Sequence, residues 1–293
     1  MKKMREQNPF NATFDHLRDV ELVEAAVEGK KEALTELVQR HNPFIYNIAL
    51  KMLGSPVDAQ DVTQDILIKL ITSLTSYDHK RAQFRTWLYR IAANTIINYK
   101  KSATEKQIVS FDQFFGFIDE IPNDEFEEDI PIAWSEESKI KCMTGMLMCV
   151  PRQDRLLYII GDLFGVDHIL GSEIFEISPA NFRKKLSRIR HHLRQWMHNR
   201  CGLVNKDNPC RCARKTKGFI ERGIVDPDNL LWNQQFASRI SDYTEQNVQD
   251  ALRSSDKIYS SLYQKHPIKK NIAASEIIDS IFSDGTLREI LEL

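Results

Sequence analysis

The sequence predicts an all-α protein built from several small helical domains. Apolar residues recur every three or four positions in successive segments, most clearly over 84–101 and 182–196, which is the period of an amphipathic helix. Ser-Pro pairs at 55–56 and 178–179 place a capping side chain before a proline at the first helical position. With 293 residues, the chain is long enough for two or three small domains with cores of their own.

Charge is distributed unevenly along the chain, although its formal net value is only −1. Residues 105–137 hold eleven acids and a single base, Lys106. Residues 178–200 hold seven Lys or Arg, three His and no acid. Such a separation into an acidic and a strongly basic segment is expected when only part of a chain binds nucleic acid.

Composition also bears on location and on thiol chemistry. No run of eighteen apolar residues occurs, so we expect no membrane insertion. The first residues carry cations without an apolar segment, so we expect no signal peptide and a cytoplasmic location.

Three of the five cysteines crowd into 201–212. In a reducing compartment this favours metal or redox chemistry over structural disulfides.

Residues 15–101 are predicted to form a first helical domain. Asp19 is the expected N-cap of a helix that stops at Gly29. The next helix ends at Gly54, and Pro43 is expected to break or bend it. The helix opened by Ser55-Pro56 carries a polar outer face made of Asp58, Asp61, Gln64 and Asp65. One interpretation is that these acids only stabilise the helix through its dipole. The other is that they form a docking face.

The helix that begins at Phe84 has two distinct stripes. One is apolar and is expected to face a core: Leu88, Ile91, Ala92, Thr95 and Tyr99. The other has no acid: Trp87, Arg90, Asn94, Asn98 and Lys101. The preceding loop adds His79, Lys80 and Arg81. An aromatic that stacks on a base, amides that read a base edge and cations for phosphate can hold an opened DNA strand. The alternative is an ordinary solvated basic face.

The second half of the chain predicts a linker and a helix–turn–helix. Residues 102–137 show no sustained period and are predicted to be an acidic linker. Residues 168–176 form the first helix of the motif, and Ser178 caps a second helix with an apolar stripe: Phe182, Leu186, Ile189, Leu193 and Trp196. Further helices are predicted at 229–240, 245–263 and 275–293.

Two segments of the first domain resemble a known family. FRTWLYRIAANTIINYKK (84–101) is similar to region 2.3–2.4 of bacterial RNA polymerase sigma factors of the extracytoplasmic-function (ECF) type, and DAQDVTQDILIKL (58–70) is similar to their region 2.2. The resemblance implies four parts: sigma region 2 at 15–101, the linker at 102–137, a region 4 helix–turn–helix at 138–200, and a Cys-rich tail with a helical extension at 201–293.

The resemblance also implies site residues. Core polymerase would bind Asp58, Asp61, Gln64 and Asp65. The −10 promoter element would contact Lys80, Phe84, Trp87, Arg90, Asn94, Asn98 and Lys101. The −35 element would contact Ser178, Asn181, Arg183, Lys184, Ser187 and Arg188. Two departures stand out: Asn98 replaces the Asp of many relatives, and no Gly follows Phe175 to close the turn of the motif.

The implied function is promoter recognition and opening with core polymerase and promoter DNA as partners, and without enzymatic activity. An anti-sigma protein is left open. One alternative is a helix–turn–helix regulator that never binds polymerase, for which an acidic docking face would have no use. Another is an enzymatic C-terminal part, but no spaced His/Glu pairs follow Arg214.

The Cys-rich tail predicts a separate site. His198, Cys201, Cys210 and Cys212 lie within fifteen residues, and such ligands suit tetrahedral Zn²⁺. No cofactor is required for the predicted function, and structural zinc here would join the helix–turn–helix to the C-terminal helices. The alternatives are a redox pair of Cys201 with Cys210 or Cys212, or reduced unmetallated thiols. Cys142 and Cys149, among methionines, are expected to be buried thiols.

Overall fold

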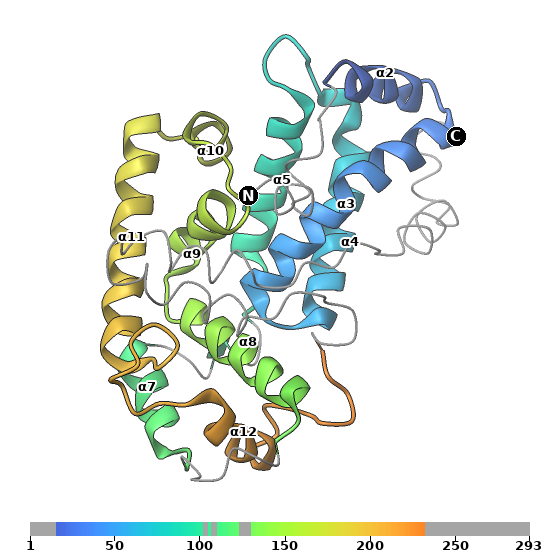
Figure 1. Cartoon of the computed structure of the whole chain (residues 1–293). Helices are drawn as coiled ribbons and strands as arrows, with labels where there is room; N and C mark the ends of the chain where they lie inside the picture. Colours follow the sequence, from blue (N-terminus) through green and yellow to red (C-terminus); the bar gives the residue numbers. More distant parts are fainter. Residues whose placement is uncertain (1–15, 102–104, 107–109, 123–129, 232–293) are drawn as a thin grey trace. The chain divides into compact units, whose positions relative to one another are not determined.

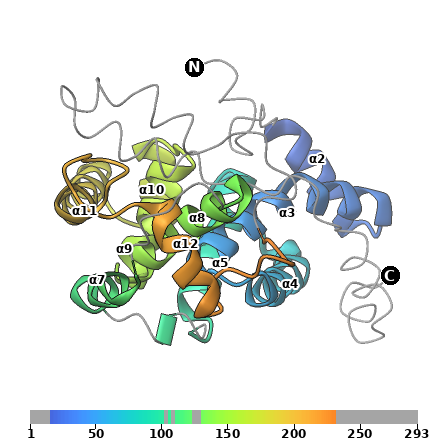
Figure 2. The same cartoon turned by 60° about the horizontal axis from the view of Figure 1, so that its bottom comes forward.

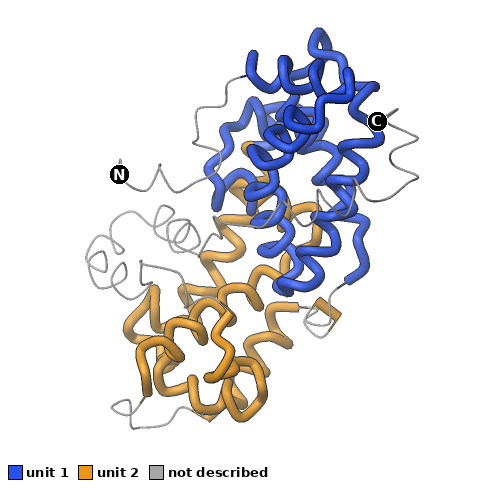
Figure 3. Tube along the Cα trace, turned by 90° about the vertical axis from the view of Figure 1, so that its right-hand side faces the viewer, with its two compact units in different colours: residues 1–102, 159–182, 268–293 blue, residues 103–158, 183–267 orange. Residues whose placement is uncertain are grey.

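The computed structural model describes residues 16–101, 105–106, 110–122 and 130–231. In these residues every regular element is a helix (Figure 1), which confirms the all-α prediction. The helices predicted beyond residue 231 lie outside the described residues. Figure 3 colours two compact units: among the described residues, unit 1 holds 16–101 and 159–182, and unit 2 holds the remainder up to 231.

Unit 1 is built around one long helix. α3 (Lys31–Leu53) packs against α2 (His16–Val27), α4 (Pro56–Ser73) and α5 (Phe84–Asn98), and these helices lie side by side in both views (Figures 1 and 2). Side chains from all of them fill one apolar core, including Leu22, Leu37, Val38, Ile45, Met52, Val62, Leu67, Leu88 and Ile96. Burial of this size dominates the stability of a small helical domain.

Asp19 was expected to cap the first helix, which is wrong, and Pro43 was expected to break or bend the second, which is not broken there. Asp19 does not cap α2, because the helix already begins at His16. Instead its carboxylate is buried and accepts a hydrogen bond from Arg40 Nε at 2.8 Å. Pro43 lies inside α3 without ending it, and its carbonyl accepts a bond from the Asn47 side chain. Apolar residues on both sides of Pro43 pack into the same core, and this packing outweighs the bond that proline removes.

The start of α4 follows the sequence prediction. Gly54 takes a left-handed conformation with φ 67° and ends α3, as glycine can do at little cost. Ser55 Oγ then accepts a hydrogen bond from Asp58 N at 3.3 Å, and Pro56 is the first helical residue. The turn between α3 and α4 is therefore determined by local chemistry.

Residues 159–182 complete unit 1. They comprise a π-helical turn (Ile159–Leu163), α10 (His168–Phe175) and the first residues of α11 (Pro179–Arg200). Phe164 packs edge-on against Phe44 of α3 with ring centroids 5.3 Å apart. The predicted single domain over 138–200 is therefore divided between the two units, because this apolar segment belongs to the core of α3.

The turn of the helix–turn–helix closes without glycine. α10 ends at Phe175, and Glu176 takes the left-handed conformation with φ 53°, which costs a non-glycine residue roughly 1–2 kcal/mol. Ser178 Oγ accepts a hydrogen bond from Asn181 N at 3.2 Å and so caps α11 as predicted. A Cβ at Gly171 would lie 2.5 Å from the Phe182 ring, so glycine at this position lets the two helices approach closely.

Unit 2 shows that the predicted linker contains helices. Ser110 caps α7 (Phe111–Glu120), and α8 (Ile132–Met148) begins before residue 138. Phe111 and Phe115 both stack on Trp196 of α11, with centroids 5.2 and 5.7 Å apart. The aromatic residues of this acidic stretch thus have a partner, and the prediction of an extended segment fails over α7.

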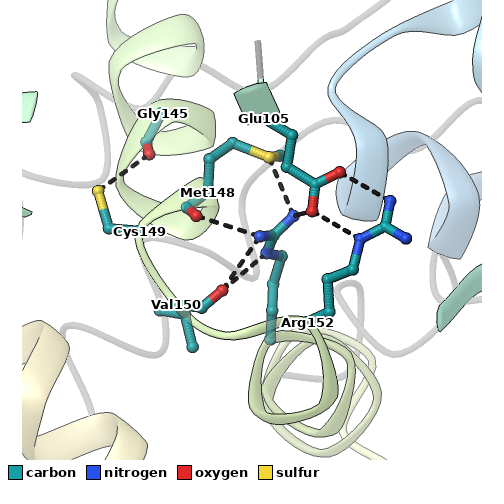
Figure 4. Close-up of polar contacts among 7 residues, drawn as sticks. Glu105, Gly145, Met148, Cys149, Val150 and Arg152 are labelled. Atoms are coloured by element: carbon teal, nitrogen blue, oxygen red, sulfur yellow. Dashed lines mark hydrogen bonds and ion pairs between the residues drawn. The ribbon is translucent and has the colours of Figure 1, made fainter. Parts of the chain in front are cut away.

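A buried ion cluster joins the start of unit 2 to α9 (Arg152–Tyr158). Glu105 accepts hydrogen bonds from Arg152 Nε at 2.7 Å and Arg155 at 3.0 Å (Figure 4). Arg155 also donates to the carbonyls of Met148 and Val150. Burial alone would raise the pKa of Glu105, but the two guanidinium groups outweigh it and hold that pKa below its ordinary value.

We predict that Glu105→Ala lowers the free energy of unfolding by about 3–5 kcal/mol, because Arg155 would stay buried without its counter-charge. Because the Glu105 pKa is depressed in the folded state, this contribution is present above the unfolded pKa and lost as pH falls through the folded one. Urea unfolding across pH 3–7 measures both effects. Glu36→Ala, which removes the exposed pair with Arg18, should cost less than about 1 kcal/mol. Equal losses for the two variants would contradict the prediction.

Candidate nucleic-acid interface

α5 presents the polar stripe that the sequence predicted. Its buried face consists of Phe84, Leu88, Tyr89, Ala92, Ala93 and Ile96, whereas Ile91, Thr95 and Tyr99 are only half-buried. On the opposite side Asn94 and Asn98 are exposed, and Trp87 and Arg90 are partly exposed. Lys101 follows the helix and is exposed. Amides, an aromatic and cations therefore share one accessible face.

Phe84 does not belong to this face. Its side chain is completely buried, with ring centroids 5.3 Å from both His41 and Tyr77 and 5.6 Å from Trp87. The prediction that Phe84 contacts DNA is wrong, because its ring is part of the core of unit 1. It supports Trp87 from the inside instead.

The loop before α5 is held in a defined conformation. The Tyr77 hydroxyl donates to the Ala82 carbonyl at 3.0 Å, and the amide of Lys80 donates to Asp78 Oδ1 at 2.9 Å. The Lys80 side chain is exposed. The basic loop is thus anchored by local hydrogen bonds that leave its predicted DNA-contacting cation at the surface.

Arg90 makes contacts that the sequence did not reveal. Its Nε donates to the Glu173 carbonyl of α10 at 2.7 Å, and a terminal nitrogen lies 3.7 Å from Glu176 Oε1. Next to it, Thr86 Oγ1 lies 3.1 Å from Glu173 Oε2. These partners are more than 80 residues away along the chain, so no local pattern could have indicated them. α10 therefore engages one member of the predicted −10 set.

The two asparagines differ in their surroundings. Asn98 donates its side-chain amide to the Asn94 carbonyl one turn earlier, at 2.9 Å. This bond occupies one amide hydrogen of Asn98. Asn98 is the residue that stands where many relatives of the family carry Asp. Asn94 lies at the middle of the exposed stripe and is the better placed of the two for a base edge.

The acidic face of α4 lies beside the end of α5. Asp61, Gln64 and Asp65 are exposed, and Asp58 is half-buried. Lys100 Nζ stands 3.8 Å from Asp58 Oδ1, and the Tyr99 hydroxyl stands 3.5 Å from Asp61 Oδ2. Contacts this long and exposed contribute little energy, so the carboxylates stay available to a partner.

α11 carries the residues predicted to read the −35 element. Asn181, Arg183, Lys184, Ser187 and Arg188 are all exposed on it, and Ser178 caps it. Within unit 2, Arg188 stands 3.8 Å from Asp154 on α9, and Lys185 stands 3.4 Å from the same carboxylate. The helix thus presents cations and small polar groups along one accessible side, as a recognition helix requires.

The predicted metal set is only partly brought together. Cys201, Cys210 and Cys212 line one cavity in unit 2, but His198 is exposed on α11 and does not. Cys142 of α8 lines the cavity instead. Sequence reasoning missed it because it lies 59 residues before Cys201, in a segment rich in methionine. In the described residues no three His, Cys, Asp or Glu side chains already stand in the arrangement of an assembled metal site.

The comparisons with known proteins fit this geometry. The family model "Sigma-70 region 2" matches residues 37–105. ECF RNA polymerase sigma factor SigW of Bacillus subtilis is 35% identical over 71 residues, 24% of this chain and 37% of that protein. SigM of Bacillus subtilis is 25% identical over 170 residues, covering 57% and 96%. The ECF sigma-E factor of Escherichia coli K12 is 27% identical over 184 residues, covering 60% and 92%.

Residues 37–105, with α4 and α5 arranged as above, are therefore a helical domain of the sigma-70 region 2 type. Beyond these residues the chain is similar to sigma factors of the ECF type, the class that the two sequence motifs indicated. The Cys-containing extension stays a prediction. Among the described helices, none combines the length and the apolar character that crossing a membrane requires.

Proposed function

We propose that this chain binds core RNA polymerase through α4, recognises −10 and −35 promoter elements through α5 and α11, and promotes opening of the duplex. The observation that carries the proposal is the arrangement of unit 1, in which α4 exposes an acidic face and α5 exposes an acid-free face of aromatic, amide and cationic groups. One face suits a basic protein surface and the other suits a separated DNA strand.

The polymerase would supply the catalytic site, and this chain would carry no bond-making chemistry. The similar proteins are RNA polymerase sigma factors by name, which supports polymerase as a partner. The acid-free face of α5 supports promoter DNA as the other partner. The proposal does not include an anti-sigma protein. Run-off transcription with purified bacterial core polymerase on a genomic promoter library tests it. A regulator that does not bind polymerase would shift DNA in binding assays but would yield no transcript with core enzyme.

Charge reversal on α4 tests the polymerase-binding face. Asp61→Lys with Asp65→Lys should weaken binding to core polymerase by about 1–3 kcal/mol, because close charge pairs across the interface are lost. Both side chains are exposed, so the circular dichroism spectrum and thermal midpoint should not change. Glu32→Lys, an exposed acid in the first turn of α3, is the matched control. Binding as tight as that of the control would remove α4 as the docking face.

Substitution on α5 tests base capture. Asn94→Ala should impair open-complex formation, measured by permanganate reactivity of the −10 bases, and should leave core binding intact. The reason is that a flipped base would lose its hydrogen bonds to the amide. Asn98→Ala, one turn away, should have a smaller effect because that amide already bonds to the Asn94 carbonyl. Normal melting with Asn94→Ala would place the pocket elsewhere.

Substitution on α11 tests −35 recognition. Arg183→Ala or Arg188→Ala should weaken binding to promoter DNA in mobility-shift assays at several salt concentrations. Loss of a phosphate contact would weaken all sequences alike and reduce the salt dependence, whereas loss of a base contact would relax one position by about 1–3 kcal/mol. Lys217→Ala, an exposed cation on α12 (Cys212–Glu221), should change neither. An unchanged −35 preference in both arginine variants would contradict the assignment.

A further inference from the structure

Four of the five cysteines line one small cavity in unit 2. Cys142 comes from the middle of α8, Cys201 follows the last residue of α11, and Cys210 and Cys212 lie at the start of α12. The remaining wall is mainly apolar: Phe115, Ile118, Met143, Met146 and Leu203. Two stretches that are distant in the sequence, α8 and residues 201–212, therefore bring sulfur to the same place, which apolar packing alone does not require.

The backbone around these sulfurs supplies hydrogen-bond donors. Cys201 sulfur is approached by the amides of Leu203 and Val204, and Cys210 sulfur by the amide of Gly202. A Cβ at Gly202 would lie 2.0 Å from the Cys210 carbonyl oxygen, so only glycine allows the loop to close this tightly. Amides directed at sulfur orient it as a ligand.

The loop between Cys201 and Cys210 is fixed by side chains as well. Asn208 donates its amide to the carbonyls of His198 and Cys201, at 2.8 and 3.2 Å. Arg211 donates to the Lys206 carbonyl at 2.8 Å. These bonds hold the two ends of the loop together and keep Cys201 and Cys210 at the same cavity.

Cationic groups surround the cavity. Lys139 and Arg200 belong to its lining, and Arg200 also pairs with Asp119 at 2.8 Å. Buried Lys215 donates to the carbonyls of Ile118 and Ile121. A divalent ion bound by four thiolates carries a net charge of −2. Lys139 already pairs with Glu136 at 2.6 Å and Arg200 with Asp119, so these cations would offset that charge in part.

We propose that Cys142, Cys201, Cys210 and Cys212 bind a single thiophilic metal ion, with Zn²⁺ the expected occupant, in a tetrahedral four-thiolate site. The cavity volume of about 20 Å³ suits one ion better than an iron–sulfur cluster. Because no assembled ligand set is present in the described residues, binding must draw the sulfurs inward.

The ion would link α8, the end of α11 and α12 within unit 2. Such a link contributes its binding free energy to folding. The fifth cysteine provides the matched control, because Cys149 ends α8, donates its thiol to the Gly145 carbonyl and does not line the cavity. His198, exposed on α11, provides a second control.

The experiment uses the untagged full chain, purified under reducing conditions and freed of metal with a chelator. Titration with Co²⁺ should give about one ion per chain, with the visible bands of tetrahedral cobalt and a near-ultraviolet sulfur-to-metal charge-transfer band. One equivalent of Zn²⁺ should displace the cobalt and raise the thermal midpoint. Cys142→Ser and Cys212→Ser should lose the bands, whereas Cys149→Ser and His198→Ala should keep them.

Three results would overturn the proposal. The first is absence of the cobalt bands together with five titratable thiols. The second is a disulfide between two of the four cysteines, found by mass spectrometry of protein prepared without oxidant. The third is a metal site that survives Cys142→Ser and disappears with His198→Ala. If a cysteine variant fails to fold, dilution of wild-type apo-protein into Co²⁺ with thiol-specific alkylation identifies which cysteines the metal protects.

Discussion

Four residues of α5 at four-residue spacing, Phe84, Leu88, Ala92 and Ile96, are no more than 1% exposed. Because a helix has 3.6 residues per turn, burying this row leaves one range of directions for the other side chains. Asn94 and Asn98 are therefore directed outward by the core, and Trp87 is supported from below by the ring of Phe84. Burial of the apolar row is thus sufficient to place the polar side chains of α5 at the surface. The packing of α5 on α3 and α4 is thus the constraint on which the predicted DNA contacts and the neighbouring acidic face both depend.

The contact between α10 and α5 has a consequence for the same face. Arg90 donates to the Glu173 carbonyl, so its guanidinium cannot give that hydrogen to a phosphate while α10 stays in place. A hydrogen bond that involves a charged group contributes about 1.5–3 kcal/mol, an amount that several phosphate contacts can exceed. Asn94 and Asn98 make no such contact with α10 in the described residues and need no rearrangement. DNA binding by the stripe, as proposed, would therefore compete with the contact between Arg90 and α10.

Local patterns were sufficient for most helices and for their ends. Ser55, Gly54 and Ser178 act through bonds to residues within four positions, so the sequence alone indicates them. The role of Phe84 could not be predicted from local patterns. An aromatic ring at the start of a helix can equally well stack on a DNA base or pack in the core. Contacts with His41 and Tyr77 decide the matter. α7 was missed although Phe111, Phe114, Phe115 and Ile118 follow a helical period, because the surrounding acids and prolines resemble those of a linker.

The cysteines show the same limit for ligand sets. Spacing in the chain indicates candidate ligands that share a loop, here Cys201, Cys210 and Cys212. It then favoured His198 as the fourth because that residue is near in sequence. On α11, however, Cys201 is buried at the helix end while His198, three residues earlier, is exposed. The fourth cysteine at the cavity is Cys142 of α8. This helix packs closely on α7, where a Cβ at Gly145 would lie 2.4 Å from the Phe114 ring. Cys142 therefore lines the cavity because of how α8 packs in unit 2, which spacing in the sequence does not indicate.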